Sequence, residues 1–278
     1  MSRSLLPFLF CAAAGASPIF AADLQSSNVL TPEEERAGWM LLFDGRTMSG
    51  WDDPRLKTPS GDAWSIEDGC LKAHAHPHIT EDLFTQETFR DFELVFDWRI
   101  SPGGNSGVKY RIQDHLFIAP LDRVGQREIF EYSVERSFQN PLHERPAKGQ
   151  DYVIGFEYQI TDDSKNGDAK GNRKHTAGAL YDMVAPSAQP ARPVGEFNHS
   201  RILVRGNHVE HWLNGVKVVD SALDSPDALQ GIEKRWAVAP HVHKLLAMQP
   251  KKDCPISLQN HDNEAWFRNI KIRRLASN

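Results

Sequence analysis

Cysteine is scarce in this sequence, and no long apolar run follows its N-terminal segment. The 278 residues include three cysteines, none of them in the CxxC spacing of zinc or redox motifs. Cys70 and Cys254 could form one disulfide in an oxidising compartment or remain two buried thiols. No later stretch is apolar enough to cross a bilayer, so we expect no membrane span.

Basic residues are fewer than acidic residues. Lys and Arg number 32 against 37 Asp and Glu, which gives a net charge of −5. Loss of residues 1–22, which contain Arg3 and no acid, would change the net charge to −6. Because binding to phosphates needs a basic face, we expect no nucleic-acid partner. The sequence leaves the oligomeric state open.

The first 22 residues have the pattern of a secretory signal peptide. Arg3 is followed by a short apolar run over residues 5–16 and then by small residues. Cleavage after Ala21 or Ala22 would place the protein in the periplasm or outside the cell. An uncleaved N-terminal anchor is the alternative interpretation.

Strand patterns dominate the rest of the chain. Residues 91–100 alternate with period two, which predicts a strand whose apolar face carries Phe92, Leu94, Phe96, Trp98 and Ile100. Further strands are predicted at 107–112, 156–160, 201–205, 208–213, 256–259 and 266–275. Asn214-Gly215 between two apolar runs predicts a tight hairpin.

Helix signals are few. Thr31 as an N-cap and Pro32 at the first position predict a short helix near residues 31–36. A second short helix is expected near residues 224–230. Many strands with so little helix predict a single all-β domain, either a sandwich or a barrel.

Eight sequence blocks, in order along the chain, resemble the 3-keto-disaccharide hydrolase domain family. They are LFDGRTMSGW (42–51), GNSGVKYR (104–111), GFEYQI (155–160), HTAGALYD (175–182), PVGEFN (193–198), HWLNG (211–215), ISLQNH (256–261) and FRNI (267–270). Two positions depart from the family pattern, since Phe197 replaces the usual Trp and Asn260 replaces a common Asp.

The resemblance implies a single concanavalin A-like jelly-roll β-sandwich over residues 39–276, with residues 23–38 as a lead-in. It implies an exported enzyme, a hydrolase or lyase, that cleaves glycosides oxidised to a ketone at sugar C3. Some members of the family are thought to cleave by elimination and rehydration. Other members are appended domains without proven catalysis.

Polar side chains fall on one face of several predicted strands. Lys109 and Arg111 share one strand, Glu157 and Gln159 a second, and Gln259 and His261 a third. Since alternate residues of a strand point to the same side, we expect a polar groove that suits a sugar.

Chemistry on a 3-keto sugar needs a base near C2, an electrophile for the enolate oxygen and an acid for the leaving group. The residues assigned to these tasks are Glu157 and His175 as bases, Lys109 and Arg111 for the enolate, and Tyr181 as the acid. The expected sugar contacts are Asn105, Gln159, Asp182, Gln259 and His261. A divalent metal held by Glu157, His175 or His261 could replace the cationic electrophile.

Two other functions stay open. A non-catalytic carbohydrate-binding module would use the same groove without turnover. A conventional glycoside hydrolase needs two carboxylates, and Glu157 is followed on its face by Gln159 and Thr161 instead. Individual residues also have structural alternatives, because Lys109 and Arg111 could form ion pairs and Asp182 could anchor a loop.

Overall fold

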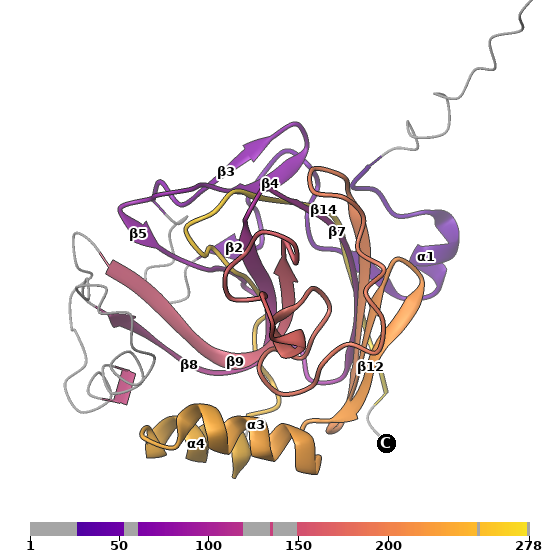
Figure 1. The fold of residues 1–278 in the computed structure, drawn as a ribbon. Helices are drawn as coiled ribbons and strands as arrows, with labels where there is room; N and C mark the ends of the chain where they lie inside the picture. Colours follow the sequence, from indigo (N-terminus) through magenta and orange to yellow (C-terminus); the bar gives the residue numbers. More distant parts are fainter. Residues whose placement is uncertain (1–26, 53–60, 119–133, 136–148, 249–250, 277–278) are drawn as a thin grey trace, which may run out of the picture.

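The computed structural model describes residues 27–52, 61–118, 134–135, 149–248 and 251–276. Its strands form two sheets that enclose one apolar core, which confirms the predicted β-sandwich (Figure 1). No helix among these residues is long and apolar enough to cross a membrane. The proposed signal peptide at residues 1–22 lies outside the described residues.

The first sheet, sheet A, contains eight described strands. Their order is β12 (Val216–Ala222), β11 (His208–Leu213), β10 (Asn198–Arg205), β7 (Phe92–Ile100), β14 (Ala265–Arg274), β4 (Cys70–Ala73) and β3 (Trp64–Glu67), with β1 (Trp39–Leu41) also pairing with β14. All neighbouring pairs are antiparallel. The hairpin predicted at Asn214-Gly215 joins β11 to β12.

The second sheet, sheet B, has six described strands and carries the polar face. Their order is β2 (Trp51–Asp52), β6 (Leu83–Thr85), β13 (Ser257–Leu258), β8 (Asn105–Ile118), β9 (Gly149–Thr161) and β5 (Ile79–Thr80). The long β8 and β9 pair antiparallel and curve together away from the core (Figure 1).

The alternating residues of β7 form the centre of the core, as predicted. Phe92, Leu94, Phe96, Trp98 and Ile100 are each at most 3% exposed. They pack in the same cluster as Phe156, Tyr158 and Ile160 of β9. Burial of one such side chain contributes about 1.5–3 kcal/mol, so this alternation fixes which faces of both sheets meet.

Two polar side chains inside the core, Tyr110 and His211, are paired with each other. The Tyr110 hydroxyl lies 2.9 Å from His211 Nε2, and His211 Nδ1 lies 3.0 Å from the Gly178 carbonyl. Burial lowers the pKa of His211 to about 4, so the ring is neutral and can donate to Gly178 while accepting from Tyr110. This chain of hydrogen bonds ties the segment around Gly178 to both sheets.

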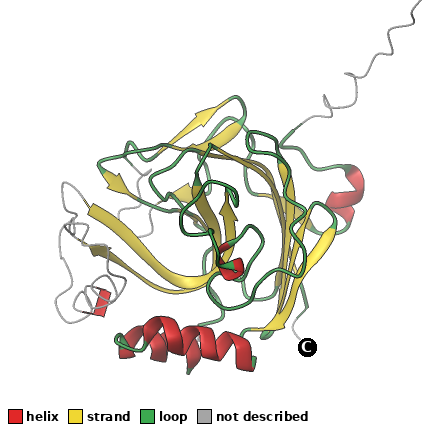
Figure 2. Cartoon of the chain, in the orientation of Figure 1, coloured by secondary structure: helices red, strands yellow, loops and turns green. Residues whose placement is uncertain are grey.

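Helices lie at the edges of the sandwich. The predicted first helix, α1 (Pro32–Arg36), has a capping box with Thr31. The second, α3 (Pro226–Trp236), is longer than expected and is followed by α4 (Pro240–Ala247), which was not predicted from the sequence. The missed helix has no side-chain cap at Ala239, so the usual start signal is absent. Both helices lie along the curved β8–β9 pair (Figure 2).

The two cysteines of the folded region are free. Cys70 and Cys254 are both buried and unpaired, which is the second of the two alternatives left open by the sequence. Burial raises the pKa of the Cys254 thiol to about 11, so this side chain behaves as a small apolar group.

Candidate active site

The adjacent strands β8 and β9 carry a row of polar side chains that faces away from the core. In their register Lys109 lies opposite Glu157, and Gly107 lies opposite Gln159. A Cβ atom at Gly107 would come within 2.4 Å of Glu157 Oε1. Glycine at this position therefore leaves the space that the Glu157 carboxylate occupies.

A cavity of about 650 Å³ lies over this row. Seven of the ten predicted site residues line it, namely Asn105, Lys109, Glu157, Gln159, Tyr181, Gln259 and His261. Asp168, Tyr152 and Arg235 also line it, although no sequence pattern had indicated them. The other three predicted residues, His175, Asp182 and Arg111, are not among the lining residues.

Lys109 places a buried positive charge in the row. Its Nζ lies 3.2 Å from Asp82 Oδ2, and both side chains are at most 5% exposed. Burial alone would lower the pKa of Lys109, but the carboxylates of Asp82 and Glu157 raise it. Burial raises the pKa of Asp82 to about 6 against the influence of Lys109. At neutral pH this pair keeps a cation beside Glu157.

Glu157 has the properties of a general base. Burial raises its pKa from 4.5 to about 7, although Lys109 acts in the opposite direction. When the Gln159 amide is oriented to satisfy its neighbours, its nitrogen donates to Glu157 Oε1 at 3.0 Å. A carboxyl group with a pKa near the working pH can both accept and return a proton.

The position of Tyr181 is set by a segment that runs along the edge of β9. The Tyr181 backbone N–H donates to the Glu157 carbonyl at 3.0 Å, and Gly178 N–H donates to the Gln159 carbonyl at 2.8 Å. The Tyr181 hydroxyl donates to Asp168 Oδ2 at 2.8 Å. Tyr181 and Asp168 are thereby brought into the cavity that contains Glu157.

His175 supports this segment from behind. Its Nδ1 lies 2.8 Å from Asp168 Oδ1, its Nε2 lies 3.0 Å from Asp182 Oδ1, and its ring stacks on Tyr181. Burial alone would lower the pKa of His175, but the two carboxylates raise it to about 9. At neutral pH the ring is an imidazolium with both N–H groups engaged. This geometry suits the positioning of Tyr181 and Asp168, and leaves no ring nitrogen free to accept a proton.

Asp182 anchors the same segment to α3. The residue has a left-handed backbone (φ 61°), and its carboxylate binds both His175 and Arg235, whose Nη1 lies 3.2 Å from Oδ2. Arg235 in turn donates to the Tyr152 hydroxyl at 3.3 Å and lies over the Tyr181 ring. The structure therefore favours the loop-anchor alternative for Asp182, with Arg235 at the cavity wall.

Arg111 does not share the face of Lys109, contrary to expectation. A bulge interrupts the β8–β9 register between Tyr110 and Asp114, and Arg111 at this bulge has φ 50°. Its guanidinium is buried and donates to Asp91 at 3.3 Å and to the Gly206 carbonyl at 2.8 Å. The bulge thus directs Arg111 toward Asp91, and the resulting ion pair joins the two sheets. This is the ion-pair alternative left open for Arg111 by the sequence.

Two further residues predicted to contact the sugar, Gln259 and His261, line the cavity. Gln259 is buried, and its Oε1 accepts no hydrogen bond from the described residues. His261 is open to the cavity but closely surrounded by protein, and this burial together with the nearby Lys109 lowers its pKa. A buried free acceptor and a neutral imidazole are groups that bind sugar hydroxyls.

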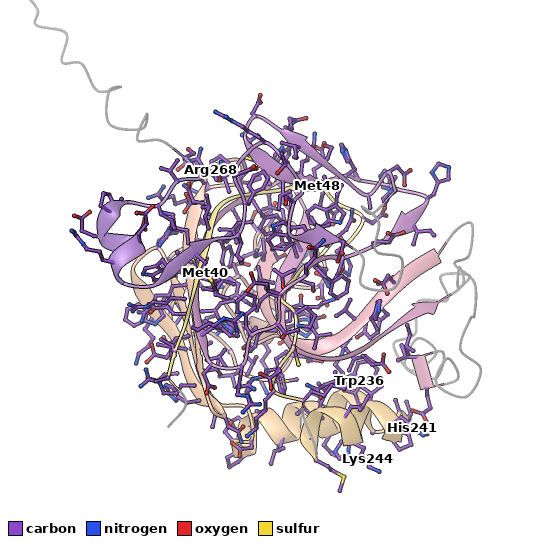
Figure 3. The ribbon with its side chains drawn as sticks, turned by 180° about the vertical axis from the view of Figure 1, so that it is seen from behind. Met40, Met48, Trp236, His241, Lys244 and Arg268 are labelled. Carbon is purple, nitrogen blue, oxygen red and sulfur yellow. The ribbon has the colours of Figure 1, made fainter. Side chains whose placement is uncertain are left out.

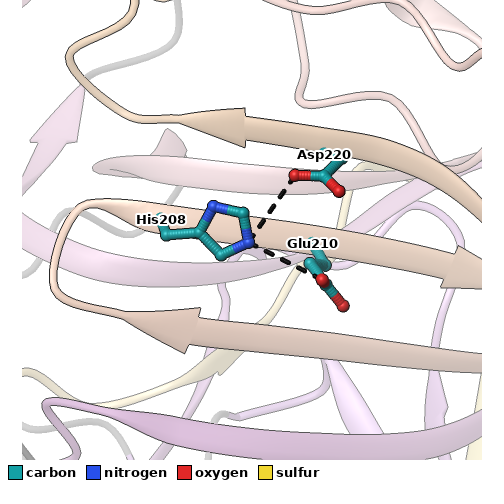
Figure 4. A group of neighbouring side chains, drawn as sticks. All are labelled: His208, Glu210 and Asp220. Atoms are coloured by element: carbon teal, nitrogen blue, oxygen red, sulfur yellow. Dashed lines mark ion pairs between the residues drawn. The ribbon is translucent and has the colours of Figure 1, made fainter.

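The ligand set suggested for a metal is not assembled. Within the described ranges, the cluster with suitable spacing is His208, Glu210 and Asp220 on β11 and β12, not Glu157, His175 and His261 (Figure 4). His208 Nε2 lies 3.6 Å from one oxygen of each carboxylate. Both carboxylates also pair with the Lys217 ammonium, so this cluster is a surface ion-pair network.

Comparison with known proteins gives consistent results. The family model described as a 3-keto-alpha-glucoside-1,2-lyase-like domain matches residues 38–273. A protein of Bacteroides thetaiotaomicron named 3-keto-disaccharide hydrolase is 30% identical over 254 residues, which cover 86% of this chain and 79% of the relative.

Two solved structures from Parabacteroides distasonis, described as candidate glycosyl hydrolases, share the fold. One is 25% identical with a TM-score of 0.65, and the match covers 90% of this chain and 100% of the chain in that structure. The other is 22% identical with a TM-score of 0.55, and the match covers 85% of this chain and 99% of the chain in that structure.

Proposed function

The chain belongs to the 3-keto-alpha-glucoside-1,2-lyase-like domain family, and we propose that it is an exported enzyme that cleaves 3-keto-glycosides. The observation that carries this proposal is Glu157, a carboxyl group with a pKa of about 7 that faces the cavity beside the buried Lys109 cation. A base and an adjacent cation are what proton abstraction next to a ketone requires.

The reaction begins at C2 of the oxidised sugar. Glu157 takes the C2 proton, and the C–H electrons form the C2–C3 double bond of an enolate whose oxygen is stabilised by Lys109. The enolate then re-forms the ketone while the C1–O bond breaks and C1–C2 becomes a double bond. Addition of water across this double bond, with a proton returned to C2, completes a net hydrolysis.

Tyr181 supplies the proton to the leaving oxygen. Burial raises the pKa of its hydroxyl well above the ordinary value, so the proton is held until an alkoxide of high basicity develops. The hydroxyl donates to Asp168 in the free protein and must turn from it to reach the leaving group. Arg235, whose guanidinium lies over the Tyr181 ring, stabilises the phenolate that results.

A second candidate function follows from Asp168, a residue that no sequence pattern indicates. It places another carboxylate in the cavity of Glu157, and two carboxylates are the minimum for a conventional glycoside hydrolase. Hydrogen bonds from His175 and Tyr181 lower the pKa of Asp168 despite its partial burial, so it stays ionised as a nucleophile would. This mechanism predicts cleavage of unoxidised glycosides.

One assay separates these functions. Purified protein is incubated with methyl 3-keto-glucoside and with methyl glucoside, with and without EDTA, and methanol release is followed by NMR. The proposal requires release from the 3-keto compound alone, and its loss in Glu157→Gln. Release from methyl glucoside supports the second function, whereas binding without any release supports a carbohydrate-binding module. A loss of activity with EDTA would add a metal to the site.

Export remains a proposal supported by the pattern of residues 1–22. Expression of the full chain in a Gram-negative host, followed by cell fractionation and N-terminal sequencing, tests it. We expect a periplasmic or secreted protein that begins at residue 22 or 23. A cytoplasmic protein with an intact N-terminus would contradict this part of the proposal.

A further inference from the structure

The cavity changes character along β9. Around Glu157 and Gln159 its walls carry polar groups from β8, β9 and the segment after β13. Toward the start of β9, beside the polar Thr80, Gln150 and Arg235, the lining includes five apolar or aromatic residues, namely Tyr152, Ile154, Met183, Trp236 and Leu246. This second set comes from β9, the segment after Tyr181, and both helices α3 and α4. We refer to these five residues as the apolar end.

The two ends are far enough apart to hold different parts of one ligand. At a strand rise of about 3.3 Å per residue, Ile154 lies roughly 10 Å along β9 from Glu157. The bulge in β8 lies opposite this stretch, and the strand pair curves there. A sugar ring at Glu157 would therefore place its C1 substituent along the strand, toward the apolar end.

The helices close this end with apolar side chains. Trp236 lies on the side of α3 that faces the curved sheet, and its ring packs edge-on against Tyr152 (Figure 3). Leu246 of α4 is 4% exposed, whereas His241 and Lys244 on the same helix point outward (Figure 3). The Tyr152 hydroxyl accepts a hydrogen bond from Arg235, and Lys109 Nζ lies 5.9 Å from the centre of the Tyr152 ring.

A second sugar is poorly matched to the five residues of the apolar end. Each hydroxyl that leaves water without a new hydrogen bond costs about 1–3 kcal/mol, and aliphatic side chains offer none. An aromatic or aliphatic group instead gains from the burial of its apolar surface. We propose that the apolar end is a subsite for an apolar, aromatic aglycone of the 3-keto-glucoside, an inference that rests on the proposed function.

The test compares substrates that differ only at C1. Wild-type protein is assayed with 3-keto-glucosides that carry methyl, benzyl or glucosyl groups. Benzyl alcohol is a weaker acid than a sugar hydroxyl, so a preference for benzyl cannot come from an easier departure. We expect kcat/KM for benzyl to exceed that for glucosyl by about tenfold or more. Cleavage of the methyl and glucosyl compounds with no benzyl preference would overturn the subsite and leave the proposed function standing.

Variants and a binding measurement separate the remaining outcomes. Leu246→Ala should lower the benzyl-to-methyl ratio of kcat/KM about fivefold or more. The matched change Leu229→Ala, on the outer side of α3 where the side chain is 37% exposed, should leave that ratio as it is. If no compound is cleaved, the proposed function fails, and calorimetric binding of the same three compounds decides the subsite. Tighter binding of benzyl than of methyl then supports it, and equal binding refutes it.

Discussion

The raised pKa of Glu157 predicts that this residue weakens the fold at the pH where it acts. Its pKa is about 7 in the folded protein, against an ordinary value of 4.5 that applies when the chain unfolds. Between these pH values the folded state keeps a proton that the unfolded state has lost. Stability therefore falls as pH rises from about 4.5 to about 7, and stays lower above it.

The size of this effect follows from the shift. One pKa unit corresponds to 1.36 kcal/mol, so the shift gives at most about 3 kcal/mol at pH 8, less whatever solvent in the cavity screens. Glu157→Gln has no proton to lose and fills nearly the same volume. We expect this variant to be more stable than the wild type at pH 8 by about 1–3 kcal/mol, and equally stable at pH 4.5.

Urea unfolding at both pH values, followed by tryptophan fluorescence, measures this difference. Glu196→Gln, at an exposed position, is the matched control and should change stability little at either pH. The same Glu157→Gln protein should lose kcat/KM for a 3-keto-glucoside by about 10²–10⁴-fold. A variant that is less stable than wild type at pH 8, or whose stability difference does not change with pH, would refute the reasoning.

Three further substitutions test the architecture around this carboxylate. Gly107→Ala places a Cβ 2.4 Å from Glu157 Oε1. This variant should lower kcat/KM about tenfold or more while its circular dichroism spectrum stays unchanged. Full activity would show that the Glu157 carboxylate moves freely. Asp182→Asn removes one of two charges that raise the pKa of His175, so its NMR titration should move below about 9, and an unmoved titration would contradict the assigned pairing. His211→Leu leaves a buried tyrosine hydroxyl unpaired and should cost about 1–3 kcal/mol in urea unfolding, whereas an unchanged midpoint would argue against the hydrogen bond.

Much of the fold follows from sequence because period-two alternation determines which side of a strand is buried. The stretch from Phe92 to Ile100 shows this directly, since its apolar face packs against the other sheet as predicted. Helix α4 escaped prediction because it begins without a capping side chain at Ala239. Its position depends on packing against β9, which no local pattern encodes.

The site was predictable where neighbouring strands keep regular register. Lys109 and Glu157 face the same cavity because β8 and β9 alternate regularly between them. Two residues further along β8 the bulge turns Arg111 to the other side, and an extra residue in a strand leaves no signal in alternation alone. Asp168 and Arg235 come from a loop and a helix end, so their convergence depends on tertiary contacts such as the pairing of Arg235 with Asp182.

Isotope exchange at C2 tests the central claim most directly. Wild-type protein cleaves a 3-keto-glucoside in D2O, and NMR follows deuterium at C2 of the released sugar, with Glu157→Gln and free 3-keto-glucose as the control for spontaneous exchange. Proton abstraction by Glu157 predicts deuterium at C2 in step with cleavage and none above the control in the variant. Cleavage that keeps the original hydrogen at C2 would contradict the enolate mechanism and indicate direct hydrolysis at C1.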